Sequence, residues 1–401
     1  MSLIGGLPPA SLSVPREDMK KQLHSPDIAD WLRLIRADGI GPVTFARLID
    51  HFGSVRNALA ASVRELTRIE GIGATTAERI ARTRRRFDPD PELRLADSLG
   101  VRLIHLQDPR YPPALKAIPD PPPVLYVRGD FARSDSLAVA IVGSRRCSLY
   151  GQEQASRLAH FLAAAGFTIV SGLARGIDAA AHQGALAAGG RTIAVQGCGL
   201  ANVFPPEHKR LFQMIAETGA CISELPLQAE PLAEHFPPRN RIIAALSLGT
   251  VVIEAGFNSG ALITARAALD YNREVMAVPG KVDSPLSRGC HQLLKQGAVL
   301  VESAADVTEA LGCITSRLTD HVADAETRAA ENTDAPLFDA ADLNLDPAES
   351  AVHQSLGKEP LHVDELIAAT NLPAGRVNAA LISLRLKGLI KQLPGNLYVK
   401  K

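Results

Sequence analysis

Residues 236–280 read FPPRNRIIAALSLGTVVIEAGFNSGALITARAALDYNREVMAVPG, and this stretch decides the fold. It contains two short apolar runs, Thr250–Ile253 and Glu274–Val278, and a loop with a glycine follows each run. The small residues between the two runs are typical of a helix packed closely on a sheet. A strand, a glycine loop and a helix in this order predict a phosphate-binding parallel sheet, in which backbone N–H groups at helix N-termini meet the ligand.

The same alternation continues on both sides of this stretch. Further apolar runs in residues 131–311 are Leu137–Val142, Thr168–Ser171, Thr192–Gln196, Ala220–Ser223 and Ala298–Val301. Apolar strands separated by helices predict an α/β core with a parallel sheet covered on both faces. Ligands of such sheets bind beyond the carboxyl ends of the strands at a topological switch point, so the loops that follow the strands are the candidate site.

Composition divides the chain into five regions. We predict a flexible N-terminus (1–26), a small helical domain (27–95), the α/β core (96–312), an acidic linker (313–346) and a small C-terminal domain (347–401). The linker assignment rests on eight acidic residues against two arginines and on the absence of sustained periodicity.

The overall composition excludes several classes of protein. Lys plus Arg and Asp plus Glu each number 43, so any basic site must be local. No apolar run approaches the roughly 20 residues of a membrane span, and no signal-peptide pattern is present. The five cysteines form no CxxC pair, which is typical of reduced cytosolic thiols. We therefore expect a soluble, cytoplasmic protein without membrane contact, metal or cofactor.

Two loops after predicted strands carry the features of an anion site. In the first, Gly143 permits a sharp turn, Ser144 offers a hydroxyl and Arg145 offers a fork for bidentate phosphate contact; Ser148 is expected to cap the next helix. The second loop contributes Ser171, Gly172, Arg175 and Gly176, whose glycines would let the backbone approach a ligand. Asp178 is expected to cap a helix or pair with an arginine. Together with His182, four residues later, it forms either an acid–base pair or an ordinary structural contact.

Two later segments extend the candidate site. Lys209 and Arg210 lie on a predicted helix and either form a basic rim or are merely solvated. Phe236, held in a stiff loop before two prolines, either stacks on a base or anchors the loop. Of Arg239 and Arg241, we expect one to face the ligand and one to anchor loops, with Asn240 between them. Glu254 is expected to hold a loop amide or an arginine, and Asn258-Ser259-Gly260 opens the next helix.

The sequence lacks the common motifs of enzymes that hydrolyse nucleotides or cleave substrates. The chain lacks GxxxxGK[ST], GxGxxG, HExxH and GxSxG. Phosphate-binding loops without a catalytic motif favour a binding protein, and we predict no catalytic residue.

Four separated segments together resemble the DNA-processing protein A (DprA, or Smf) family. They are IVGSRRCSLYG, VSGLARGIDAAAH, FPPRNRIIAALS and VVIEAGFNSGALITARAALDYNREVMAVPG, and the similarity spans roughly residues 100–310. The resemblance implies an extended Rossmann-like core that binds and protects single-stranded DNA, forms a homodimer and helps load the RecA recombinase during natural transformation. By this resemblance the strand contacts are Gly143, Ser144, Arg145, Arg175, Lys209, Phe236, Arg239 and Asn258-Ser259-Gly260.

The flanking regions fit this resemblance. Residues 69–82, IEGIGATTAERIAR, resemble a helix-hairpin-helix (SAM-like) unit, and DGIGPVTFARLI at Asp38–Ile49 is an earlier, weaker copy. Residues Ala348–Val399 resemble a winged helix in which Arg376, Asn378, Arg385 and Lys387 could line a recognition helix. A role in binding DNA or in binding proteins stays open for both domains.

Two rival functions remain. Phosphoribohydrolases that release the base from a nucleoside monophosphate share a Gly-Thr-x-x-Glu turn, which Gly249–Glu254 resembles with one extra residue. A scaffold that binds no nucleic acid is the other rival, and it would require the loop arginines to be neutralised by buried carboxylates.

Overall fold

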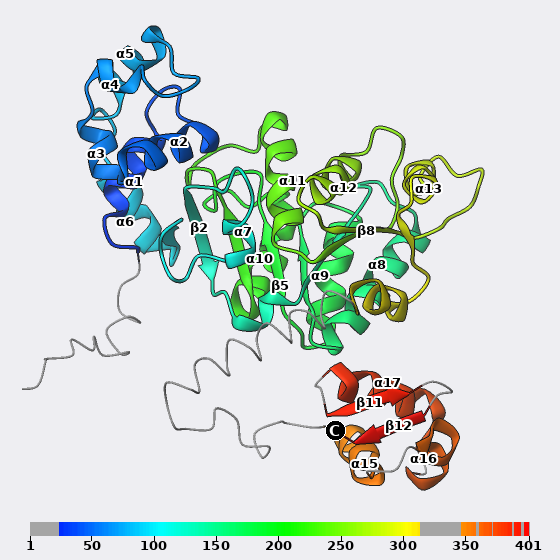
Figure 1. Cartoon of the computed structure of the whole chain (residues 1–401). Helices are drawn as coiled ribbons and strands as arrows, with labels where there is room; N and C mark the ends of the chain where they lie inside the picture. The colour runs from blue at the N-terminus through cyan, green and yellow to red at the C-terminus, as the bar shows by residue number, and fades with distance from the viewer. Residues whose placement is uncertain are drawn as a thin grey trace, which may run out of the picture. The chain divides into compact units, whose positions relative to one another are not determined.

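The computed structural model describes residues 24–312, 346–357, 361–370, 372–386, 389–393 and 397–400. The predicted flexible N-terminus, except for its last three residues, and the predicted acidic linker, except for Asp346, lie outside these residues. The chain divides into two compact units. The first comprises the described residues up to Tyr111 together with Pro119–Arg128 and Glu224–Leu227, and the second comprises the rest (Figure 1).

The first unit is a small helical domain with an added strand pair. Its helices are α1 (Ile28–Ile35), α2 (Pro42–Phe52), α3 (Val55–Ala60), α4 (Val63–Leu66), α5 (Ala74–Thr83) and α6 (Asp90–Leu99). Strands β1 (Arg102–His105) and β2 (Val124–Gly129) pair antiparallel, with Arg102 opposite Val127. Trp31 stacks between Phe45, at 5.1 Å, and His105, at 4.4 Å, and so joins α1 to α2 and to β1.

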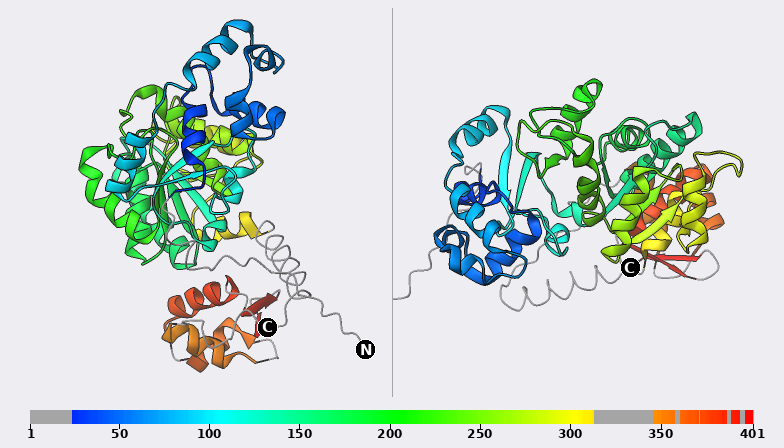
Figure 2. Two further views of the ribbon diagram at one scale, coloured as in Figure 1. Left: turned by 90° about the vertical axis from the view of Figure 1, so that its left-hand side faces the viewer. Right: turned by 90° about the horizontal axis from the view of Figure 1, so that it is seen from above.

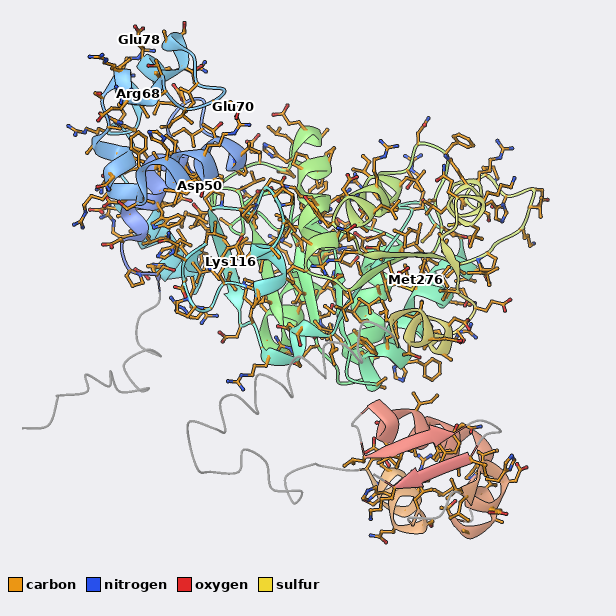
Figure 3. All side chains as sticks on the ribbon, in the orientation of Figure 1. Asp50, Arg68, Glu70, Glu78, Lys116 and Met276 are labelled. Atoms are coloured by element: carbon orange, nitrogen blue, oxygen red, sulfur yellow. The ribbon has the colours of Figure 1, made fainter. Side chains whose placement is uncertain are left out.

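In the two predicted hairpins of this unit, an arginine from the helix after each hairpin lies over the glycine of the other hairpin. Gly39 and Gly71 both have positive φ, 92° and 83°, and each precedes a helix by the same number of residues. The Arg47 side chain from α2 lies over Gly71 and donates to the Glu70 carbonyl at 2.8 Å, while Arg79 from α5 lies over Gly39. Acidic Glu70 and Glu78 are exposed beside the second hairpin (Figure 3).

The second unit contains the parallel sheet that the sequence predicts. Its strands are β3 (Ala138–Val142), β4 (Thr168–Ser171), β5 (Thr192–Val195), β6 (Ala220–Ser223), β7 (Gly249–Val252), β8 (Glu274–Ala277) and β9 (Val299–Leu300). They lie in the order β6-β5-β4-β3-β7-β8-β9, and each strand pairs parallel with its neighbours in this order. Each predicted run agrees with an observed strand to within one residue at each end.

Helices connect these strands in two opposite directions. Helices α8 (Leu149–Ala164), α9 (Ile177–Ala187) and α10 (Lys209–Thr218) carry the chain from β3 through β4 and β5 to β6. Helix α11 (Phe236–Ala245) returns the chain to β7 on the other side of β3, and α12 (Gly260–Asp270) and α13 (Arg288–Lys295) lead outward to β8 and β9. Right-handed crossovers in opposite directions place the helices on both faces of the sheet (Figure 2). The switch point therefore lies between β3 and β7.

Apolar packing fixes this arrangement. All residues of β3, β4, β5, β6 and β7 are buried, as expected for a sheet covered on both faces. One core cluster joins α8 and α9 to β3 and β4, with Leu158 and Ala181 among its members. It extends to Met276 of β8, which is fully buried and is labelled in Figure 3. Shorter elements of this unit are α7 (Pro113–Lys116) and three 3-10 turns, Arg133–Ser136, Pro206–His208 and Ala233–His235.

The C-terminal residues form a small body with its own apolar core. Helices α15 (Pro347–Ser355), α16 (Val363–Thr370) and α17 (Ala374–Leu386) accompany a three-stranded sheet, β10 (Leu361–His362), β12 (Leu397–Lys400) and β11 (Ile390–Leu393). This confirms the predicted winged-helix pattern. Arg376 and Asn378 are exposed on α17, whereas the Arg385 side chain and Lys387 lie outside the described part of the chain.

Among the described residues, no helix is long and apolar enough to cross a bilayer. Cys147, Cys198, Cys221 and Cys290 are free thiols, and the first is the least buried of the four; Cys313 falls outside the described ranges.

Candidate functional site

A cleft of about 670 Å³ opens at the carboxyl ends of β3 and β7, at the switch point of the sheet. The loop after β3, the loop after β7 and the start of α11 line it. The predicted site residues in its lining are Gly143, Ser144, Arg145, Phe236, Arg239, Asn240, Asn258, Ser259 and Gly260. Three separated sequence segments thus meet at one place.

The loop after β3 is held against the loop after β7. The Ser144 backbone N–H donates to the Glu254 carbonyl at 2.7 Å. Glu254 is 5% exposed, and its carboxylate accepts from the Ser148 N–H at 2.8 Å and from the Ser148 hydroxyl at 2.5 Å. The prediction that Glu254 holds a loop amide is confirmed. Ser148 also caps α8 by accepting from the Gly151 N–H, as predicted.

Arg239, near the start of α11, is far less exposed than Arg145. Arg239 is 4% exposed and donates from one guanidinium nitrogen to the Gly172 carbonyl at 2.7 Å and to the Val195 carbonyl. Its Nε donates to the side-chain oxygen of Asn240 at 3.2 Å. Burial lowers the pKa of Arg239 to about 10, so the group stays charged at neutral pH. Arg239 therefore anchors the loops after β4 and β5, and its burial argues against the direct strand contact that the sequence predicts.

Phe236 brings aromatic and cationic groups together at the edge of the cleft. The guanidinium carbon of exposed Arg145 lies 4.8 Å from the centre of its ring, and that of Arg239 lies 5.8 Å from it. The Phe204 ring is 5.8 Å away and tilted by 47°. The ring is half-buried and fixed in place by these neighbours.

The loop after β4 is a structural cap and contains no acid–base pair. The Asp178 carboxylate accepts from the backbone N–H groups of Gly172, at 3.2 Å, and Ala174, at 3.4 Å. Burial raises its pKa. His182 instead hydrogen-bonds the Thr192 hydroxyl at 2.6 Å, and burial lowers its pKa to about 3. The imidazole is therefore neutral at physiological pH, and the acid–base alternative is excluded by geometry.

At three of the predicted glycines, neighbouring atoms of the protein leave no room for a side chain. A Cβ at Gly172 would lie 2.3 Å from the Arg239 guanidinium, and one at Gly143 would lie 2.6 Å from Ile177. Gly176 has a φ of 78°, and a Cβ there would lie 2.4 Å from the Ser144 carbonyl. At Gly260, in contrast, a Cβ would meet open space. Gly260 lines the cleft.

The remaining predicted residues lie around the cleft or behind it. Arg175 and Gly172 line a small hollow that shares Arg145 and Phe236 with the cleft, and Arg175 is ion-paired with exposed Glu207. Ser171 is fully buried and donates to the Ile141 carbonyl at 2.7 Å, so its burial also argues against strand contact. Gly176, Lys209 and Arg241 are outside the cleft lining; Lys209 is exposed at the start of α10 and Arg241 is half-buried.

Sequence reasoning missed some residues of the cleft. Arg146 is exposed and lines it beside Arg145, and Phe204 contributes a ring. The doubled arginine directly after a strand and a glycine was a usable signal for Arg146. Within the described ranges, no group of three or more His, Cys, Asp or Glu side chains could hold a metal ion.

Comparison with known proteins identifies the family. The family model "DNA recombination-mediator protein A" matches residues 102–312, which is more than half of the chain. The chain belongs to this family. Models of a DprA-like N-terminal HHH domain and of a DprA winged helix domain match residues 26–83 and 335–396. The family, the parallel α/β core and both flanking domain types that the sequence predicts are thereby confirmed.

Relatives in this family cover nearly the whole chain. Protein Smf of Synechocystis sp. is 36% identical over 93% of this chain and 98% of its own length. Protein Smf of Escherichia coli is 37% identical over 93% of this chain and 96% of its own length. The crystal structure of DNA processing protein A (DprA) from Streptococcus pneumoniae superposes with a TM-score of 0.62 at 34% identity, and it covers 70% of this chain and 97% of that one.

Proposed function

We propose that this protein is a single-stranded DNA-binding protein of DNA uptake, which protects incoming strands during natural transformation and helps load the RecA recombinase on them. It would act in the cytoplasm, as a homodimer, and without catalysis. Family membership supports the link to recombination, because the matched family is a recombination mediator. The residues of the cleft support the choice of ligand.

The observation that carries the proposal is the placement of exposed arginines at the switch point. Arg145 and Arg146 are exposed in the lining of the cleft, and the N-terminus of α12 belongs to the same lining. Ser259 caps that helix by accepting from the Ala261 N–H, at 3.3 Å. Guanidinium groups and a helix N-terminus that line one cleft can both bind phosphate.

The aromatic ring of Phe236 favours a single strand over a duplex. Single-strand binding combines a basic groove with rings on which unpaired bases stack, whereas bases inside a duplex are already stacked and paired. Phe236 lines the cleft together with Arg145 and Phe204. A strand with unpaired bases can place a phosphate on the arginine and a base near the ring.

The buried titratable groups near the cleft are hydrogen-bonded within the fold, which supports a binding role. Glu254, the counterpart of the phosphoribohydrolase carboxylate, is buried and bonded to Ser148. Asp178 caps a loop and His182 is neutral and bonded to Thr192. Each would have to leave a buried hydrogen bond before acting on a substrate.

The proposal is tested with a fluorescent oligothymidine of about 30 nucleotides, a matched duplex and a mixture of nucleoside monophosphates. We expect binding that favours the single strand, and no release of free base from the monophosphates. Base release that is abolished in Glu254→Gln would instead establish the phosphoribohydrolase. Absence of binding to either DNA, without base release, would favour the scaffold.

A further inference from the structure

Glu254 contacts both ends of the loop that carries the two exposed arginines. This loop joins β3 to α8, whose N-cap is Ser148. Near the start of the loop, the Ser144 N–H donates to the Glu254 carbonyl at 2.7 Å. At its end, the Glu254 carboxylate accepts from the Ser148 N–H at 2.8 Å and from the Ser148 hydroxyl at 2.5 Å. Arg145 and Arg146 lie between these two points of attachment.

The sheet and its loops in turn hold Glu254 in place. It directly follows β7, and the N–H of the preceding residue, Ile253, donates to the Val142 carbonyl at 3.1 Å. The N–H of the following residue, Ala255, donates to the Leu286 carbonyl at 2.7 Å. Glu254 itself is 5% exposed. An exposed loop is therefore attached at both ends to one buried and well-anchored residue.

The first turn of α8 leaves room for the carboxylate. A Cβ at Gly151 would lie 2.5 Å from a carboxylate oxygen of Glu254. The Ser148 hydroxyl, which donates to that carboxylate, also accepts from the Gly151 N–H at 3.1 Å. Among the described residues that line the cleft, neither Glu254 nor Ser148 is present. Glu254 can therefore influence a ligand of the cleft through the loop rather than by touching the ligand.

We infer that Glu254 is a positioning residue, which holds the loop of Arg145 and Arg146 ready for a strand and so strengthens binding of an anion despite its own negative charge. This inference rests on the proposed function. A carboxylate near a phosphate site repels the ligand, so the charge of Glu254 by itself weakens binding. A loop that is ordered before binding spares the free energy of ordering it on the ligand, so the hydrogen bonds of Glu254 strengthen binding. The two effects have opposite signs, and variants can separate them.

The first experiment measures the affinity of full-length wild-type protein and of Glu254→Gln for oligothymidine of about 30 nucleotides. The amide keeps one oxygen that can accept from Ser148, but its NH2 group meets the second Ser148 donor. Loss of positioning predicts binding that is about 2- to 12-fold weaker, the size of ordering one side chain on the ligand. Unchanged or tighter binding by Glu254→Gln would overturn the inference and leave the proposed function intact. Failure of the wild type to bind would instead remove the proposed function.

Two further variants keep the negative charge but break the contact. Glu254→Asp shortens the side chain by one methylene, and Gly151→Ala places a Cβ where the carboxylate lies. Both should weaken binding by a similar factor, even though alanine favours a helix more than glycine does. In a background of Arg145→Ala with Arg146→Ala, Glu254→Asp should leave the remaining affinity unchanged. Full affinity in both charge-keeping variants would overturn the inference.

The loop can also be observed without DNA, because trypsin cleaves after Arg145 and Arg146. Cleavage is followed by mass spectrometry under native conditions, with Arg133, exposed in the 3-10 turn before β3, as the internal reference. Cleavage after Arg145 and Arg146 should be faster in Glu254→Gln than in the wild type, while cleavage after Arg133 should be unchanged. Equal acceleration at all three sites would show general destabilisation and overturn the inference.

Thr168→Val is the control for a purely structural effect. Thr168 is 1% exposed at the amino end of β4, away from the cleft, and its hydroxyl donates to Asp135 at 2.8 Å. The substitution should lower the melting temperature but should change neither the affinity for oligothymidine nor the cleavage after Arg145. A loss of affinity in folded Thr168→Val equal to that in folded Glu254→Gln would contradict a positioning role for Glu254.

Discussion

Acidification from pH 7 to pH 5 should destabilise the α/β core through His182. The Thr192 hydroxyl donates to the Ile169 carbonyl, so the 2.6 Å contact with His182 requires the Nδ1–H of the ring to donate. The next proton must then enter at the buried Nε2, for which the described residues provide no hydrogen-bond partner. Burial, reinforced by His208 and Arg239, lowers the pKa of His182 from 6.5 to about 3.

The sign and size follow from the linkage of protonation to folding. Below pH 6.5 the unfolded chain binds a proton at this residue and the folded protein does not, so the stability that neutral His182 provides is lost as the pH falls from 6.5 toward 3. Each unit of pH costs about 1.4 kcal/mol, so pH 5, which lies about 1.5 units below 6.5, costs about 2 kcal/mol.

His182→Asn provides the matched control, because its side-chain amide can still donate to Thr192 but does not titrate. Urea unfolding is followed by far-ultraviolet circular dichroism, since the only tryptophan, Trp31, lies in the first unit. Wild-type stability should fall by about 2 kcal/mol more than that of the variant between pH 7 and pH 5. Comparing the two proteins removes the opposing contribution of Asp178, whose pKa is raised by burial. Equal pH dependence in both would refute the reasoning.

Two further predictions concern packing. Gly172→Ala should destabilise the core by about 1–3 kcal/mol in urea unfolding, because its Cβ would lie 2.3 Å from the Arg239 guanidinium. Gly260→Ala places its Cβ in open space, so it should change stability by no more than about 0.5 kcal/mol, yet it should weaken strand binding. Equal destabilisation by the two substitutions would contradict the packing role of Gly172. Arg84→Met should destabilise the first unit by about 2 kcal/mol, seen in Trp31 fluorescence, because buried Arg84 donates to the Ala58 and Ala61 carbonyls. Unchanged Trp31 unfolding would show that these bonds contribute nothing net.

The sequence predicted most of the core because the covered parallel sheet imposes uninterrupted apolar runs, as in Thr168–Ser171 and Ala220–Ser223. It missed β1 and β2, which flank a proline-rich passage and pair antiparallel. The only helix between their short runs is α7, whose four residues are too few to mark a parallel crossover. The periodicity of the sequence therefore revealed the connections and not the added strand pair.

The sequence predicted several loops that meet at the cleft, but it did not predict how deeply each side chain is buried. Arg145 and Arg239 both follow the pattern of a phosphate-binding arginine, yet one is exposed and the other is 4% exposed. That difference arises because α11 crosses the ends of β4 and β5 and directs Arg239 at their carbonyls. The residues around Arg239 in the sequence do not predict that crossing. The same limit applies to Gly172, whose need for space is set by a residue 67 positions away.

The salt dependence of single-strand binding tests the central claim most directly. Affinity for a fluorescent oligothymidine is measured from about 50 to 300 mM salt for the wild type and for Arg145→Ala. Each phosphate contact on a single strand contributes about 0.7 to the slope of log affinity against log salt. Arg145→Ala should therefore reduce the slope by about 0.7 and weaken binding by about 1–3 kcal/mol. A wild-type affinity that does not change with salt, or a slope and affinity unaltered by Arg145→Ala, would contradict a phosphate contact in this cleft.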